Sequence, residues 1–172
     1  MISSKLLDEM KEALRRAMQA EHQGYYFYHM AAAHTEDARG KQVFADLAEQ
    51  ERQHFDYLRR QLHALESTGE PDPSVDFEVP DTDPATHPIF SDGIRSRIGG
   101  AHYEMTALAV GVQLEANSRD FYLEQAKKAG GGRLAEFFRK LAEWESVHYR
   151  LLLEQQQALQ QDHWSAARFE PF

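Results

Sequence analysis

Apolar residues recur every three to four positions in four long stretches of the chain, the spacing that places them on one face of an α-helix. The first stretch covers residues 4–34, and Ser3 or Ser4 is suited to cap its start. After a break around residues 35–40, a second stretch runs to about residue 65. The remaining two stretches cover about 101–129 and about 133–161. We therefore predict an all-α chain with four long helices.

The segment between the second and third stretches has a different composition. Residues 66–92 contain all but one of the six prolines, several acidic residues and no helical period. A connection of this length has room to carry the chain from one end of a helix bundle back to the other. We therefore expect a four-helix bundle in one domain, with helices two and three running parallel. Its parts are hairpin one at 4–66, a crossover at 67–100, hairpin two at 101–161 and an aromatic tail at 162–172.

The chain also repeats itself. A shift of 94 residues aligns the two expected hairpins without a gap, and even the breaks between helices coincide. Among the aligned pairs are Glu21 with Glu115, Tyr28 with Tyr122, Glu51 with Glu145, and His54 with His148. This pattern predicts a bundle with a pseudo-twofold axis, because neither hairpin alone can bury its apolar face.

Each apolar stripe is interrupted by a glutamate where a leucine is expected: Glu21, Glu51, Glu115 and Glu145. Burying an ionised carboxylate without a partner is costly, and four of them close together would also repel one another. No lysine or arginine lies on these stripes near the glutamates. The positive charge must therefore come from outside the chain.

Two divalent metal ions would balance the four carboxylates. Glu51-x-x-His54 and Glu145-x-x-His148 each place a carboxylate and an imidazole one helical turn apart, and this spacing occurs nowhere else in the chain. One copy usually marks a solvated helix face, but two copies in register are hard to explain by chance. Two such pairs with a glutamate from each remaining helix form the ligand set of di-iron and di-manganese bundles. Iron is the first expectation for the metal, with manganese or zinc as alternatives.

Several other residues have two possible roles. Tyr28 and Tyr122 each lie seven residues after an inward glutamate, so they are either core aromatics or partners that hydrogen-bond the ligand carboxylates and can be oxidised. Glu49 and Glu143 also repeat, but they should point away from the site. Surface positions are expected for the other histidines, which are His22, His29, His34, His63, His87, His102 and His163.

Composition narrows the range of functions. The chain has no cysteine, which excludes disulfides, thiolate-bound zinc and cysteine catalysis. Its formal net charge of −9 disfavours binding to nucleic acid or to anionic membranes. It has no apolar run near the roughly 20 residues that a membrane span needs, and its start does not look like a signal peptide. We therefore expect a cytoplasmic protein.

The two Glu-x-x-His segments resemble a known family. Leu-Ala-Glu-Gln-Glu-Arg-Gln-His-Phe at 47–55 and Leu-Ala-Glu-Trp-Glu-Ser-Val-His-Tyr at 141–149 look like rubrerythrin and the wider ferritin-like superfamily. The resemblance covers residues 13–65 and 107–159. It implies a ferritin-like fold and activity on oxygen, peroxide or ferrous iron. It also implies a di-iron site ligated by Glu21, Glu51, His54, Glu115, Glu145 and His148.

The chain departs from that family in two respects. Rubrerythrins often have a further glutamate three residues after the one that matches Glu115, and here that position is Ser118. They also often carry a cysteine-ligated rubredoxin domain, which this cysteine-free sequence lacks. The nearest match is therefore the rubrerythrin-like proteins that have the ferritin-like domain alone, and a peroxidase of this kind would need an external electron donor.

The first functional hypothesis is a di-iron oxidoreductase of the ferroxidase or peroxidase type. The alternatives are a protein that sequesters metal with little turnover, and a structural bundle that holds inert zinc or manganese. We expect Glu21 and Glu115 to bridge both ions. We also expect a homodimer or a higher homo-oligomer, because related proteins pair through bundle faces.

Overall fold

The computed structural model describes residues 3–80, 89–94 and 101–166. Within these ranges the chain forms four long α-helices and no strand, so the predicted all-α four-helix bundle is confirmed. The helices are α1 (Ser4–His34), α2 (Ala38–Ser67), α3 (His102–Ala129) and α4 (Gly132–Ala166).

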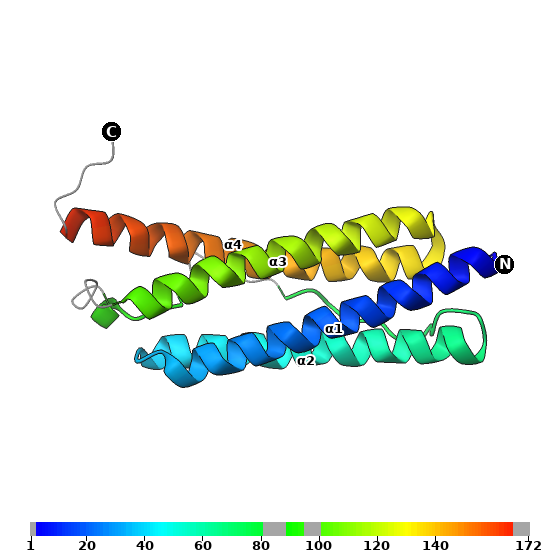
Figure 1. Ribbon diagram of the computed structural model, residues 1–172, viewed down its shortest axis with the longest axis horizontal. Helices are drawn as coiled ribbons and strands as arrows, with labels where there is room; N and C mark the ends of the chain where they lie inside the picture. Colours follow the sequence, from blue (N-terminus) through cyan, green and yellow to red (C-terminus); the bar gives the residue numbers. More distant parts are fainter. Residues whose placement is uncertain (1–2, 81–88, 95–100, 167–172) are drawn as a thin grey trace.

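The helices form two antiparallel pairs, α1 with α2 and α3 with α4 (Figure 1). The crossover returns the chain along the length of the bundle, so α2 and α3 run in the same direction, as predicted (Figure 1). Val75, Phe77 and Val79 of the crossover pack against the apolar core between the helices. The crossover therefore covers the bundle as well as connecting its halves.

Two helix boundaries differ from the sequence-based prediction. The α2 helix begins at Ala38, inside the expected break, because the Asp37 carboxylate accepts a hydrogen bond from the Gly40 N–H at 2.9 Å and caps the helix. The α4 helix continues to Ala166, past the expected end near residue 161, since no proline or glycine interrupts it there. Trp164 is thus helical and 41% exposed. The rest of the predicted tail, 167–172, lies outside the described residues.

The core consists of two apolar clusters, one in each half of the bundle's length. The first includes Met10, Leu14, Leu58, Leu65, Phe138 and Leu141, and the second includes Phe44, Leu47, Leu108 and Leu152. Along every helix, the inward glutamate lies between the residues of the two clusters. The polar site is therefore enclosed at mid-length by apolar packing on both sides.

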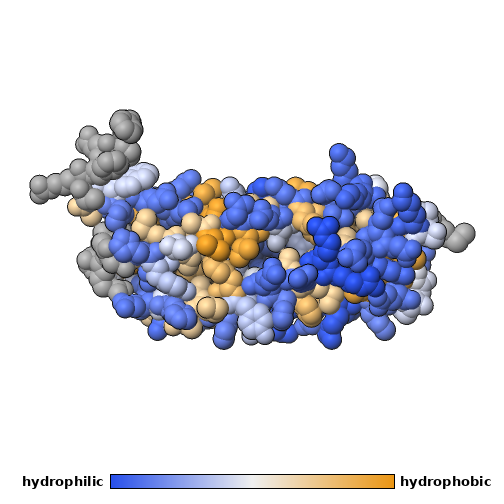
Figure 2. Space-filling model, viewed as in Figure 1, coloured by the Kyte–Doolittle hydropathy of each residue, from blue (hydrophilic) through white to orange (hydrophobic). Residues whose placement is uncertain are grey.

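The surface seen in Figure 2 is largely hydrophilic, with an apolar patch over α3. Exposed apolar side chains of α3 include Val110 (40%) and Leu123 (50%). In the described ranges, 3–80, 89–94 and 101–166, no helix has an apolar stretch long enough to cross a membrane. The expected homo-oligomer stays a prediction.

Candidate metal centre

All six predicted ligands are buried and lie together at the centre of the bundle. The exposed fraction is between 0% and 4% for Glu21, Glu51, His54, Glu115, Glu145 and His148. Helices α1 and α3 each contribute one glutamate, and α2 and α4 each contribute one Glu-x-x-His pair. The 94-residue repeat thus becomes a local symmetry of the site.

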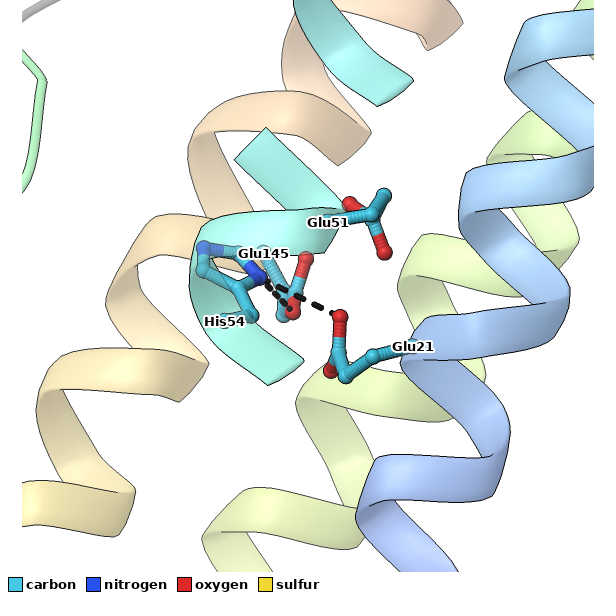
Figure 3. Close-up of side chains that lie close together, drawn as sticks. All are labelled: Glu21, Glu51, His54 and Glu145. Carbon is cyan, nitrogen blue, oxygen red and sulfur yellow. Dashed lines mark hydrogen bonds and ion pairs between the residues drawn. The ribbon is translucent and has the colours of Figure 1, made fainter. Parts of the chain in front are cut away.

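The six side chains form two overlapping groups of possible ligands. One consists of Glu21, Glu51, His54 and Glu145, which Figure 3 shows, and the other of Glu51, Glu115, Glu145 and His148. Within each group the possible ligand atoms all lie within 4.8 Å of one another.

The two glutamates that belong to both groups are Glu51 and Glu145. The expectation that Glu21 and Glu115 reach both ions therefore disagrees with the geometry. The two Glu-x-x-His helices place their glutamates between the groups, and the glutamates of α1 and α3 lie at the outer ends.

Both histidines present Nδ1 to the carboxylates. The His54 Nδ1 atom lies 3.1 Å from Glu145 Oε1 and 3.3 Å from Glu21 Oε2 (Figure 3). The His148 Nδ1 atom lies 3.4 Å from Glu145 Oε2 and 3.5 Å from both Glu51 Oε1 and Glu115 Oε2. Each imidazole therefore has the same nitrogen at one of the two groups.

The two tyrosines cross between the hairpins. The Tyr28 hydroxyl of α1 donates to Glu115 Oε1 of α3, and the Tyr122 hydroxyl of α3 donates to Glu21 Oε1 of α1. Tyr28 and Tyr122 are also among the largest fully buried side chains. They therefore fill both roles considered from the sequence, core packing and hydrogen bonding to the expected ligands.

Burial and mutual repulsion perturb the pKa values of the carboxyl groups. Desolvation, together with the nearby Glu145, raises the pKa of Glu115 to about 8, and desolvation with the three other glutamates raises the pKa of Glu51 well above its usual value. Burial also disfavours the charged form of Glu145, but His54 and His148 outweigh it and lower the Glu145 pKa.

The pKa values of the two histidines are raised, which favours a positive charge beside these carboxylates. Burial disfavours protonated His54, but Glu145 and Glu21 outweigh it and raise the His54 pKa. Glu115 has the same effect on the pKa of His148. Without metal, the site therefore compensates its negative charge by holding protons, and a cation that binds there must displace them.

The unpaired atoms of the site fit two divalent cations. Among the described residues, Glu51 Oε1, both carboxylate oxygens of Glu145 and His148 Nδ1 are buried without a hydrogen-bond partner. Buried polar atoms are normally satisfied, so a cluster of orphaned acceptors indicates a ligand. The ion pairs of the six residues within the described chain involve only one another. A set of carboxylates and imidazoles suits iron, manganese or zinc.

A cavity of about 260 Å³ opens onto this site between α1 and α3. It reaches Glu51 and Glu115, and its other walls include Ala20, Gly24, Leu114, Ser118, Phe121 and both tyrosines. Ser118 stands at the position where rubrerythrins often have a further glutamate, so the wall there is polar but carries no charge. The cavity therefore leaves open space beside two of the four carboxylates, Glu51 and Glu115.

Sequence reasoning missed Gly24. A methyl group at this position would lie 2.7 Å from Glu51 Oε2, so glycine leaves the space that the carboxylate occupies. The sequence did contain a signal for a special role of this position. The 94-residue repeat aligns Gly24 with Ser118 and not with a second glycine.

Replacing Gly24 by alanine should weaken metal binding about tenfold, the effect typical of disturbing a ligand's surroundings. The added methyl group would push Glu51 away from its position between the two groups. Metal titration measures the change, and Gly131→Ala is the control because nothing lies within 4 Å of that position. If Gly24→Ala protein binds metal with unchanged affinity, Glu51 does not need this space.

Most of the remaining sequence-based placements hold. The side chains of His22, His29, His34, His63 and His102 are exposed, as are Glu49 and Glu143. His163 is partly buried, because the extended α4 carries it beside His102 at a ring distance of 6.1 Å. His87 lies outside the described residues.

Comparison with known families agrees with this geometry. The family model described as Rubrerythrin matches residues 6–92 and 106–170, which is most of the chain. Neither curated proteins nor solved structures gave a significant match.

Proposed function

Because the chain belongs to the rubrerythrin family, we propose that it is a di-iron oxidoreductase that oxidises ferrous iron with O₂ or peroxide. The observation that carries the proposal is the pair of overlapping buried groups, each with three glutamates and one histidine. This donor set matches the charge and the ligand preference of two ferrous ions.

The proposed division of roles follows from which side chains belong to which group. Glu51 and Glu145 would hold both ions, whereas Glu21 with His54 and Glu115 with His148 would each complete one position. Two ferrous ions held there would supply one electron each, which is the chemistry that a two-electron oxidant requires.

The surroundings orient two of the four carboxylates and leave Glu51 room to move. Glu21 and Glu115 each accept a tyrosine hydrogen bond, which orients their carboxylates and keeps a proton nearby. Among the described residues, neither Glu51 Oε1 nor the two carboxylate oxygens of Glu145 has a hydrogen-bond partner, but of these two side chains only Glu51 borders Gly24 and the cavity. We therefore assign Glu51 as the carboxylate that changes position when the charge of the site changes.

The cavity suits a small oxidant. It reaches Glu51 and Glu115 directly, while the apolar clusters close the site on both sides along the length of the bundle. With Ser118 instead of a further glutamate, the resemblance to rubrerythrins favours ferroxidase activity over peroxidase activity. A peroxidase cycle would require electrons from a separate donor.

The test is to load the metal-free protein with two ferrous ions per chain without oxygen, and then add O₂ or hydrogen peroxide. We expect near-ultraviolet absorption of an oxidised dinuclear iron site and consumption of the oxidant. Glu145→Ala should abolish both signals. Glu143→Ala should leave them unchanged, because Glu143 lies on the same helix but is exposed.

Other outcomes would select one of the alternatives. Tight iron uptake without oxidation would support sequestration. Exclusive retention of zinc, with no iron uptake, would support a structural role.

A further inference from the structure

The internal repeat fails immediately before each Glu-x-x-His pair. Residue 50 on α2 and residue 144 on α4 are equivalent positions, but the first is Gln50 and the second is Trp144. Each precedes a shared glutamate of the site and lies beside the histidine of the other hairpin. The two histidines therefore have different neighbours although the six expected ligands repeat.

His148 has a hydrogen-bond partner on the side away from the carboxylates. Its Nε2 atom lies 3.0 Å from Gln50 Oε1, and the Trp144 Nε1 atom lies 2.9 Å from the same oxygen. An indole N–H is only a donor, so the Gln50 atom that it contacts is the carbonyl oxygen of the amide. That oxygen can only accept, and the His148 Nε2 must therefore carry a hydrogen and donate it.

This hydrogen bond determines which nitrogen of His148 faces the site as a base. With the hydrogen on Nε2, the neutral ring keeps its lone pair on Nδ1, which lies among Glu51, Glu115 and Glu145. A hydrogen bond of this kind also fixes the ring plane and makes the imidazole a better ligand. Gln50 thus orients His148 for metal binding.

His54 has no equivalent acceptor. Its Nδ1 atom faces Glu21 and Glu145, but its fully buried Nε2 atom has no hydrogen-bond partner among the described residues. The imidazole also packs against the Trp144 ring, with centroids 4.5 Å apart and planes at 80°. The indole confines the His54 ring by packing but provides no carbonyl oxygen to accept its hydrogen.

We propose that the two metal positions are inequivalent, and that Gln50 makes the position of His148 the one that fills first. This position comprises Glu51, Glu115, Glu145 and His148, and it should bind a divalent ion about tenfold or more tightly than the His54 position. The inference rests on the proposed metal centre and adds an order of loading to it. In this account Gln50 is a positioning residue, because it acts only through His148.

The first experiment uses the unchanged protein. Metal-free protein is given one equivalent of Co²⁺ per chain and crystallised, and anomalous scattering at the cobalt edge locates the ion. We expect most of the cobalt beside His148. Equal occupancy of the two positions, or a preference for the His54 position, would overturn the inference.

The second experiment tests whether Gln50 is the cause. Titration of the unchanged protein with Co²⁺, followed by its visible absorption, should show two binding steps. In Gln50→Leu protein the tighter step should weaken about tenfold while the weaker step stays in place. Gln53→Leu is the matched control, because Gln53 lies on the same helix and, among the described residues, its side-chain amide donates a hydrogen bond to the exposed Glu49 and to none of the six expected ligands.

Trp144→Phe separates the two contacts of the indole. It removes the hydrogen bond to Gln50 but keeps an aromatic ring beside His54, so the two-step order should persist. If Gln50→Leu protein retained both steps unchanged, Gln50 would not orient His148 for binding. If two ions bound with equal affinity, the inferred order of loading would be wrong but the proposed metal centre would still stand. If the protein failed to bind two ions, the metal centre itself would be wrong.

Discussion

Removing the metal should lower the melting temperature of this protein by about 10–20 °C. A ligand present at 100 times its dissociation constant stabilises the folded state by about 2.7 kcal/mol per site. For a chain of this size, 1 kcal/mol corresponds to roughly 2–4 °C. Two filled sites therefore account for the expected shift, which calorimetry of chelated and metal-loaded protein measures. Addition of manganous or ferrous ion should restore the original melting temperature.

The destabilisation should be larger at pH 8 than at pH 6. The pKa of Glu115 is raised to about 8, and those of Glu51, His54 and His148 are raised as well, so the folded metal-free protein binds more protons than the unfolded chain in this range. Its stability must then fall as pH rises from 6 to 8. The lowered pKa of Glu145 contributes stability above its unfolded value, and this contribution is constant across the window.

Metal loading should reverse the pH trend, because bound ions replace the protons. If complete chelation left the melting temperature unchanged at both pH values, a buried dinuclear site would be excluded.

The fold and the set of six clustered residues could be predicted from the sequence because both depend on periodicity. A glutamate on an apolar stripe must face the core with its neighbours, and the 94-residue repeat indicates that the four stripes share one axis. The sequence therefore predicted that Glu21 and Glu115 lie beside the two Glu-x-x-His pairs, as they do in the structure. Helix type and facing direction are local properties, so one sequence is sufficient to predict them.

The identity of the side chains that reach both groups depends on how the four helices are positioned relative to one another. No local pattern in the sequence indicates these relative positions. The sequence-based expectation chose Glu21 and Glu115, but the shared side chains are Glu51 and Glu145. The contacts of Gln50 with His148 and of Trp144 with His54 cross between helices in the same way. The repeat shows that positions 50 and 144 differ, but only the packing shows that they adjoin the histidines.

Alanine replacements of the six proposed ligands should fall into two classes of metal content. Glu51→Ala and Glu145→Ala should lose both ions, because each side chain belongs to both groups. The other four replacements are Glu21→Ala, His54→Ala, Glu115→Ala and His148→Ala. Each should lose about one ion per chain and nearly all oxidase activity, because two-electron chemistry needs both ions. Metal analysis after gel filtration measures the difference.

Two exposed histidines provide controls for this series. His29→Ala and His63→Ala should keep both ions and full activity, because neither has a glutamate at the matching spacing. The result that separates the two ligand schemes is the comparison of Glu51→Ala with Glu21→Ala. If Glu21→Ala lost both ions and Glu51→Ala only one, the carboxylates of α1 and α3 would be the shared ligands. The side chains would then have to rearrange when metal binds, since in this structure Glu21 reaches only the group of His54.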